Sequence, residues 1–189
     1  MEAISKTSKI SKLIRLTLII VAGSILLTIS AKIKIPFYPV PMTMQTFVVL
    51  FLGMALGPKV GLATVALYLI EGILGFPVFA NSPEKGIGLI YFTGPTMGYL
   101  IGFLVAAFLA GLLTTSKNKN NYLSIFFKLL FSVSFIYVLG LLWLGALIGW
   151  DKPIFKLGAQ PFLLDELFKL TLLTALYPWI TKINLKLFR

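Results

Sequence analysis

Long apolar runs, separated by short polar stretches or stretches rich in proline and glycine, dominate this sequence of 189 residues. A helix that crosses a bilayer needs about 20 mainly apolar residues, and the chain has room for about six such helices with short connections. The runs and their flanking helix-ending residues predict helices at about 13–33, 43–56, 59–74, 96–113, 122–148 and 161–180. We therefore expect an all-α, polytopic membrane protein with six transmembrane helices in a single membrane domain, residues 1–189.

The first apolar run, Leu13 to Ile33, follows the basic residues Lys6, Lys9, Lys12 and Arg15. A cleaved signal peptide also has a basic start, but its apolar core normally has about 7–15 residues. Because this run is longer, we interpret it as a permanent helix, with cleavage as the alternative.

Several connections have unusual compositions. Residues 32–41 hold three prolines within six residues, which predicts a stiff extended loop. Gly57-Pro58-Lys59 predicts a tight turn that makes the flanking helices a hairpin. The 75–95 connection is rich in glycine and proline yet strongly apolar, so we interpret it as a lid or a re-entrant element. Residues 150–160 are expected to form a short amphipathic connection.

Small residues recur every four positions in the helix expected at 96–113: Gly94, Gly98, Gly102, Ala106 and Ala110. Such a ridge allows a neighbouring helix to approach closely. Packing within the molecule is the favoured interpretation, and a dimer interface is the alternative.

Composition narrows the possible functions. The chain is 58% hydrophobic and 12% charged, and it has neither histidine nor cysteine. The commonest general base and the thiolate metal ligands are therefore missing, and we predict neither an enzyme nor a metal or cofactor site. No nucleotide-binding motif is present, so energy for active transport would have to come from another subunit. The net charge of +11 resides mainly in lysines at the ends of apolar runs, which is typical of membrane topology and argues against nucleic-acid binding.

The distribution of Lys and Arg predicts orientation, since these residues accumulate on the cytoplasmic side. With six helices both termini share one side, which collects ten basic residues against five on the other. The ten are Lys6, Lys9, Lys12, Arg15, Lys59, Lys117, Lys119, Lys182, Lys186 and Arg189; the five are Lys32, Lys34, Lys85, Lys152 and Lys156. We expect both termini in the cytoplasm of a multi-pass protein of the cytoplasmic membrane.

Charged residues inside membrane helices are costly and usually functional. Asp165 and Glu166 stand four and three residues before Lys169, so either carboxylate can reach the ammonium on one helix face. One interpretation is a polar anchor for a ligand that enters from outside. The alternative is an interfacial ion pair near a helix N-terminus.

Glu71 is a fourth charge in a predicted span, and solvation at a loop edge is its favoured explanation. Neutral hydrogen-bonding residues lie toward the same face at Gln45 and Asn81. Most aromatic residues should belong to the core or to an interfacial belt. Those that could line a ligand pocket include Tyr91, Tyr99 and Tyr137.

Five short blocks occur in order along about residues 35–175. They are Val40-Pro-Met-Thr-Met-Gln-Thr46, Leu56-Gly-Pro-Lys59, Gly75-Phe-Pro-Val-Phe-Ala80, Gly94-Pro-Thr-Met-Gly-Tyr-Leu-Ile-Gly-Phe103 and Pro161-Phe-Leu-…-Lys169. Each block alone is unspecific, but the ordered set closely resembles the BioY family, the biotin-binding S components of energy-coupling factor (ECF) transporters.

This resemblance implies a six-helix S-component fold with both ends inside and a biotin site under the outer loops. It also implies a transmembrane coupling protein and two ABC-type ATPases as partners. The family's last block usually reads Pro-Phe-x-Pro-Gly-Asp-x-x-Lys, which places its acid on Glu166 and its lysine on Lys169, with Asp165 peripheral. Asn81 matches a position that carries a ligand-binding asparagine in some members.

The chemistry of biotin fits these residues, because a carboxylate and an amide can satisfy its ureido group and a lysine can meet its valerate. The alternative role of Lys169 is to hold Glu166 in place. The predicted substrate-binding residues are Asn81, Glu166, Lys169, Asp165, Gln45, Tyr91, Tyr99 and Tyr137. An S component for another vitamin and a stand-alone membrane facilitator remain the alternatives.

Overall fold

The computed structural model describes residues 2–36, 38–115 and 121–188, with side chains between residues 10 and 183 of those ranges. The helices in this part are α1 (Glu2–Lys32), α2 (Gln45–Ile73), α3 (Met97–Thr114), α4 (Tyr122–Ile148), α5 (Ile154–Gly158) and α6 (Leu163–Phe188). Short elements are the strands β1 (Lys34–Ile35) and β2 (Met42–Thr43) and the 3-10 helices η1 (Gly88–Thr93) and η2 (Gln160–Phe162).

Some of the basic residues that predict the membrane orientation lie outside the described part of the chain. Lys117, Lys119 and Arg189 lie outside the described residues, as do the side chains of Lys6, Lys9 and Lys186.

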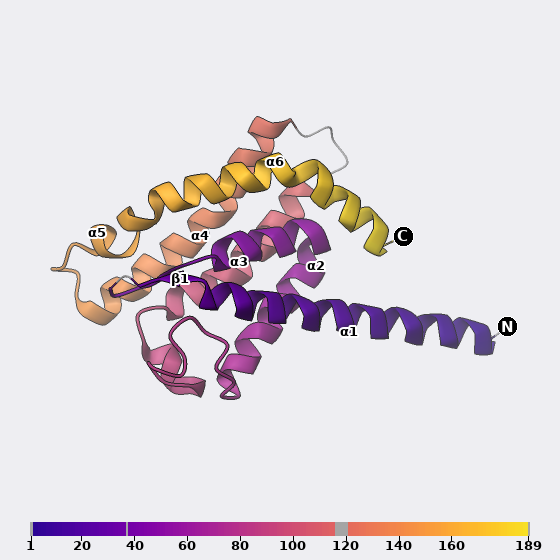
Figure 1. The fold of residues 1–189 in the computed structure, drawn as a ribbon, viewed down its shortest axis with the longest axis horizontal. Coiled ribbons are helices and arrows are strands. Elements are labelled where there is room, and N and C mark those ends of the chain that lie inside the picture. Colours follow the sequence, from indigo (N-terminus) through magenta and orange to yellow (C-terminus); the bar gives the residue numbers. More distant parts are fainter. Residues whose placement is uncertain (1, 37, 116–120, 189) are drawn as a thin grey trace.

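The long helices pack in one bundle with α2 at its centre. α2 contacts α1, α3 and α6, while α4 packs against α3 and α6. The start of α1 and the end of α6 lie at the same end of the bundle, and β1 and α5 lie at the opposite end (Figure 1). Glu71 of α2 accepts a hydrogen bond from Ser24 of α1 at 2.9 Å, so this carboxylate joins two helices rather than facing only solvent.

α2 is bent sharply at Gly57, whose φ of 78° and ψ of 173° are not helical. The positive φ suits glycine, and Pro58 then starts the second arm of the helix. The two arms fold back on each other so closely that a Cβ atom on Gly61 would lie 2.9 Å from the Cα atom of Gly53. The chain thus turns at the predicted place, and the two arms of α2 are the two helices of the expected hairpin.

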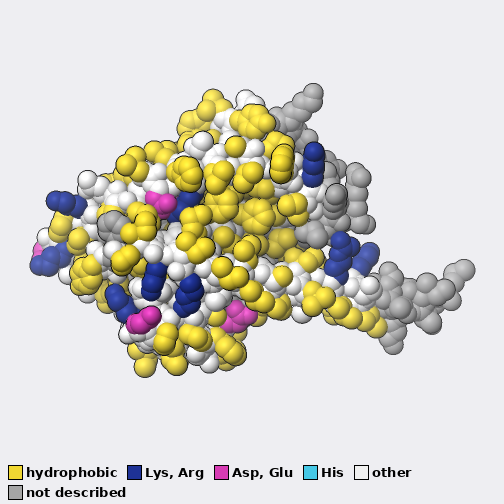
Figure 2. Space-filling view, viewed as in Figure 1, with side chains coloured by type: hydrophobic (Ala, Val, Ile, Leu, Met, Phe, Trp, Pro, Cys, Tyr) yellow, Lys and Arg dark blue, Asp and Glu magenta, His cyan; other side chains and the backbone are white. Residues whose placement is uncertain are grey.

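The surface of the bundle is suited to lipid. In the described part of the chain, four helical stretches are long and apolar enough to cross a membrane by length and composition: Ile10–Lys32, Gln45–Ile73 with its bend at Gly57, Met97–Thr114 and Tyr122–Ile148. Large apolar side chains of α1, such as Leu18, Ile25 and Ile29, are exposed. In Figure 2 a broad hydrophobic area separates charged side chains at the two ends of the face shown. These features are those of a multi-pass membrane protein.

The ridge of small residues on α3 packs inside the molecule. A Cβ atom on Gly102 would lie 2.6 Å from the Cα atom of Ile136 in α4, and one on Gly98 would meet the carbonyl oxygen of Leu139. Ala106 and Ala110 are fully buried. Internal packing, the favoured interpretation of this pattern, is confirmed.

The connection between α1 and α2 differs from the expected extended loop. β1 and β2 pair in an antiparallel hairpin, with Lys34 opposite Thr43 and Ile35 opposite Met42. Strands of two residues are too short to leave an alternating pattern in the sequence. The hairpin carries Met42 and Thr43 to the centre of the bundle, where they form part of a cavity wall.

Candidate ligand-binding site

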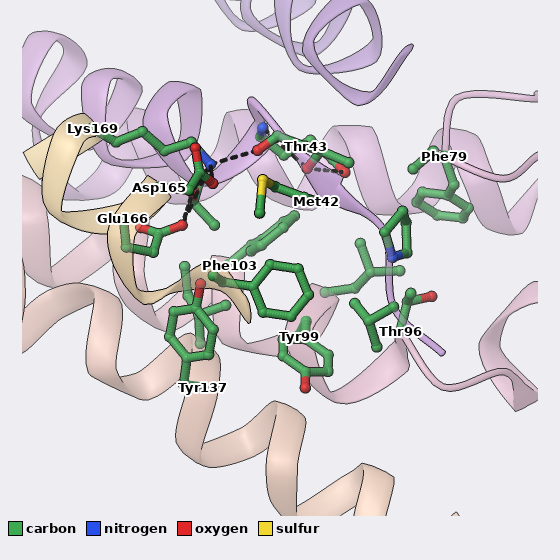
Figure 3. A pocket seen from close by; sticks show the side chains of 18 of the residues that line it. Met42, Thr43, Phe79, Thr96, Tyr99, Phe103, Tyr137, Asp165, Glu166 and Lys169 are labelled. Atoms are coloured by element: carbon green, nitrogen blue, oxygen red, sulfur yellow. Dashed lines mark hydrogen bonds and ion pairs between the residues drawn. The ribbon is translucent and has the colours of Figure 1, made fainter. Parts of the chain in front are cut away.

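A cavity of about 550 Å³ lies where α2, α3, α4 and α6 meet the β-hairpin and the 75–95 connection. Its walls are mainly apolar and aromatic, with charged side chains gathered on one side (Figure 3). The lining residues are Val40, Pro41, Met42, Thr43, Gln45, Thr46, Phe79, Ala80, Tyr91, Thr96, Tyr99, Leu100, Phe103, Ile136, Tyr137, Phe162, Asp165, Glu166 and Lys169.

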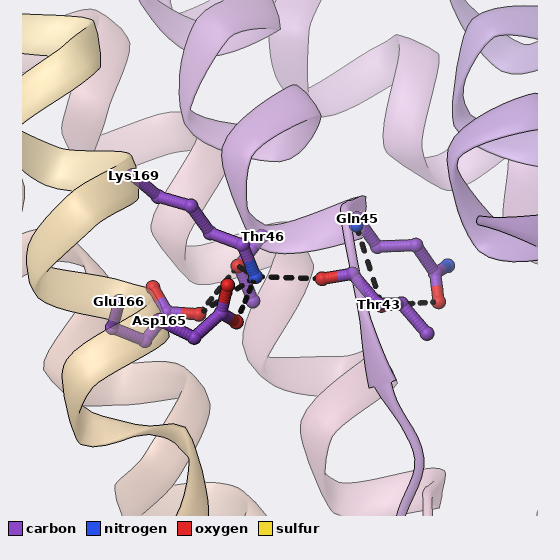
Figure 4. Close-up of polar contacts among 6 residues, drawn as sticks. All are labelled: Thr43, Gln45, Thr46, Asp165, Glu166 and Lys169. Atoms are coloured by element: carbon purple, nitrogen blue, oxygen red, sulfur yellow. Dashed lines mark hydrogen bonds and ion pairs between the residues drawn. The ribbon is translucent and has the colours of Figure 1, made fainter. Parts of the chain in front are cut away.

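Lys169 is the centre of the charged side of the cavity, and its side chain is only 2% exposed. The Nζ atom lies 2.5 Å from Asp165 Oδ2 and 3.5 Å from Glu166 Oε1. It also donates to the carbonyl oxygen of Thr43 at 2.6 Å and to Thr46 Oγ1 at 3.1 Å (Figure 4). Such a buried charge is tolerated because every side of the ammonium has a hydrogen-bond acceptor.

The local spacing on α6 brings this group together. The three charged residues follow one face of the first turns of the helix, at the i, i+3 and i, i+4 distances at which side chains meet. Thr43 and Thr46 come from β2 and the start of α2, which pack against that face. Asp165 and Glu166 also lie near the helix N-terminus, where negative charge is favoured.

The charge of this group has a direct consequence for binding. An ammonium has three donors, and Lys169 already has four acceptors within reach. Two carboxylates against one ammonium leave the group with a formal charge of −1. Lys169 therefore has no donor left for a ligand carboxylate in this arrangement.

Glu166 offers an acceptor to the cavity. Its Oε1 atom accepts a hydrogen bond from Thr46 Oγ1 at 2.5 Å, whereas Oε2 is buried without a partner among the described residues. The hydroxyl group of Tyr137 points toward this carboxylate and is close enough to interact with it (Figure 3). A buried acceptor without a donor is costly, and a ligand N–H group would satisfy it.

Aromatic rings form the opposite wall. Tyr99 is anchored by its hydroxyl group, which donates to the carbonyl oxygen of Gly158 at 2.8 Å. Its ring meets that of Tyr137 edge to face, with centroids 6.2 Å apart, and Tyr137 lies 6.3 Å from Phe162. With Phe103 they provide a rigid apolar surface for a ring system.

The 75–95 connection covers one end of the cavity through Phe79, which is 1% exposed. Its ring stacks on Tyr91 at 4.6 Å and meets Tyr68 edge to face at 5.3 Å. The Tyr68 hydroxyl group donates to the carbonyl oxygen of Val78 and accepts a hydrogen bond from Gln45 Nε2 at 2.7 Å. Burial raises the pKa of Tyr91, so its hydroxyl group is neutral at physiological pH.

Seven of the eight residues predicted from the sequence line this cavity. Asp165 also lies in the wall and forms the shortest contact with Lys169, and its peripheral role toward a ligand stays a prediction. Asn81 is the exception, because it lines a smaller cavity of about 230 Å³ together with Lys85. The two cavities share Tyr91 and Thr96 and are therefore adjacent.

Other lining residues were not predicted from the sequence. Thr43 and Thr46 lie on either side of Gln45 in the block Val40–Thr46, but a threonine in an apolar stretch carries no distinctive signal. Phe79 stands directly before Ala80 in another quoted block, where its aromatic character was the available signal. Its position in the wall depends on how the 75–95 connection folds back over α2.

A bundle of lipid-facing helices around a largely apolar cavity with one buried charged group defines a class: small-molecule-binding proteins embedded in the membrane. Comparison with known proteins specifies the family. The chain belongs to the BioY family, whose sequence profile matches residues 4–185.

Individual relatives agree with this assignment. The probable biotin transporter BioY of Pyrococcus horikoshii is 39% identical over 144 residues, which are 76% of this chain and 82% of the relative. The biotin transporter BioY of Thermotoga maritima is 37% identical over 145 residues, which are 77% of this chain and 83% of the relative. These relatives are named as transporters and not as enzymes.

The fold also has a solved counterpart. The crystal structure of the S-component for biotin from an ECF-type ABC transporter matches with a TM-score of 0.73 and 26% identity, covering 93% of each chain. The expected all-α S-component fold is therefore confirmed.

Proposed function

We propose that this chain binds biotin with high affinity and captures it for uptake across the cytoplasmic membrane, as the S component of an ECF transporter. Its BioY relatives and the matching crystal structure are named for biotin. The structural observation that carries the proposal is the buried Glu166 carboxylate, whose Oε2 atom has no partner among the described residues and which lines an otherwise largely apolar cavity. The ureido group of biotin has the N–H donors that this oxygen needs.

The charges favour one orientation of the ligand. The ureido ring is placed against Glu166, where the group with Asp165 and Lys169 carries a formal charge of −1 and would repel a carboxylate. The fused rings lie against Tyr99 and Tyr137, and the valerate points away from α6. The smaller cavity with Lys85 lies beyond Tyr91 and offers a cation to the carboxylate.

The partners follow from the energy requirement. The sequence has no nucleotide-binding motif, so we assign ATP hydrolysis to two ABC-type ATPases and its transmission to a transmembrane coupling protein. Uptake of labelled biotin should require these subunits in a host that otherwise lacks them. Uptake by this chain alone would instead identify a stand-alone facilitator.

We assign both termini to the cytoplasm, and the excess of ten basic residues over five supports this assignment. The common location of the start of α1 and the end of α6 supports an even number of crossings (Figure 1). Reporter fusions after residue 189 and within residues 117–119 should both report cytoplasm. A signal from the outer side at either position would refute this topology.

Titration calorimetry of the purified protein with biotin is the decisive experiment. A panel of other vitamins tests the alternative substrates, and biotin methyl ester tests the role of the carboxylate. Biotin should bind most tightly and the ester more weakly, with Lys85→Met removing most of the difference between them. Preference for another vitamin would overturn the assignment of the substrate.

A further inference from the structure

Lys32, the last residue of α1, and Lys34 of β1 bind one short turn of the 75–95 connection. Lys32 Nζ donates to the carbonyl oxygens of Phe79 and Ser82, each at 2.8 Å. Lys34 Nζ donates to the carbonyl oxygen of Ala80 at 2.6 Å and to Asn81 Oδ1 at 3.1 Å. All four consecutive residues, 79–82, are therefore held by ammonium groups that lie 46 to 50 positions away in the sequence.

The turn 79–82 has few other attachments. Backbone hydrogen bonds donated by residues 78–86 to other backbone groups end within residues 76–83 in the described part of the chain. Connections to the rest of the protein are the rings around Phe79, the Tyr68–Val78 hydrogen bond and the Tyr91 hydroxyl group. A segment with mainly local backbone bonds opens at low cost unless side chains hold it.

The same turn closes the cavity, because Phe79 and Ala80 form part of its wall. Neither Lys32 nor Lys34 lines the cavity. Their effect on a ligand must therefore pass through the turn that they hold.

The lysines also connect the turn to the opposite end of the cavity. Lys34 belongs to β1 and pairs with Thr43 of β2, whose carbonyl oxygen accepts the hydrogen bond from Lys169 of α6. The β-hairpin thus has one lysine contact on each side: Lys34 reaches out to the turn, and Lys169 reaches in from α6.

We propose that Lys32 and Lys34 form a latch that keeps the turn 79–82 closed over the ligand and thereby sets the rate at which the ligand leaves. They are positioning residues that act through Phe79 and Ala80, not ligand contacts. The inference rests on the proposed function, since it assigns a kinetic role at that same cavity.

The test uses Lys32→Met, Lys34→Met and the double variant of the full chain in detergent or nanodiscs. Hydrogen bonds to a charged group contribute about 1.5–3 kcal/mol when buried and less when exposed, as here, so each variant should release labelled biotin roughly three- to tenfold faster. Association should be unchanged or faster. Lys34→Arg should keep the slow release, because its guanidinium can donate to the same oxygens.

Biotin methyl ester separates a latch from a direct contact. A latch accelerates release of biotin and of the ester by the same factor, whereas a lysine that touches the carboxylate affects biotin alone. The matched control is Lys152→Met, which removes an exposed lysine paired with Asp151 outside the cavity and should leave release unchanged. An effect confined to biotin, or unchanged release in both single variants, would overturn the latch.

A second measurement does not depend on any ligand. Amide hydrogen exchange of residues 76–95 in the ligand-free protein should become faster in Lys32→Met and Lys34→Met, while α3 and α4 keep their protection. The measurement also separates opening of the turn from a loss of overall stability, since general unfolding would accelerate exchange in the helices too. If the wild-type protein binds no biotin but exchange responds as described, the proposed function fails and the lysine contacts stand; unchanged exchange refutes the latch itself.

Discussion

The two ends of the cavity use lysine in opposite ways. At the α6 end, Lys169 is almost completely buried and neutralises one of two carboxylates in a group whose distances are set by a single helix. At the other end, Lys32 and Lys34 are exposed and bind mainly backbone carbonyl oxygens of a turn without regular structure. We propose that the first end recognises the ligand and that the second end closes over it.

This difference predicts where substitutions act. Changes at the α6 end should alter affinity through lost recognition and through unbalanced buried charge. Changes at the other end should act on rates, with smaller effects, because exposed hydrogen bonds are partly replaced by water.

The largest effect is expected for Lys169→Met. The substitution keeps an unbranched apolar stem but leaves Asp165 and Glu166 without their counter-charge, and breaking a buried ion pair costs about 3–5 kcal/mol. We expect a clearly lower melting temperature together with a loss of biotin affinity of more than about 100-fold, measured by thermal unfolding and titration calorimetry.

Two further variants show whether the lost charge of Lys169 causes the lower stability and the lower affinity. Lys156→Met changes an exposed lysine of α5 in the same way and should alter neither property. Combining Lys169→Met with Asp165→Asn and Glu166→Gln should restore stability without restoring binding. A stable single variant with normal affinity would mean that the group is only an interfacial ion pair.

Two amide substitutions, one at each acid, test which carboxylate contacts the ligand. Glu166→Gln places a donor where a ligand N–H needs an acceptor, so affinity should fall roughly ten- to a hundredfold with little change in melting temperature. Asp165→Asn should cost less than about tenfold, because the Asp165 side chain is 22% exposed, against 7% for Glu166. The opposite order in calorimetry would make Asp165 the ligand-binding acid.

The smallest effect is expected at the closing end, from Tyr68→Phe. The variant loses the hydrogen bonds from Gln45 and to Val78 but keeps the ring against Phe79. We expect biotin to dissociate about fivefold faster, with affinity reduced by a similar factor. Tyr122→Phe, at an exposed tyrosine at the start of α4, is the control for removing a hydroxyl group. A loss as large as that of Lys169→Met would erase the distinction between the two ends.

The sequence alone was sufficient for features that depend on neighbours along the chain. Apolar runs predicted the membrane helices because a bilayer imposes a length on them. The spacing of Asp165, Glu166 and Lys169 predicted their contacts because an α-helix places residues three and four apart on one face. Gly57 and Pro58 predicted the sharp bend, since their backbone preferences are local.

Contacts between distant segments were decided by the tertiary structure. Lys169 meets Thr43 across 126 positions, Asn81 faces the smaller cavity rather than Glu166, and Lys32 binds the turn at Phe79. No local pattern encodes these pairings, because a lysine can reach any acceptor within the length of its flexible side chain. Which acceptor it meets depends on how the β-hairpin, the 75–95 connection and α6 pack together around α2, and that packing is a property of the whole chain.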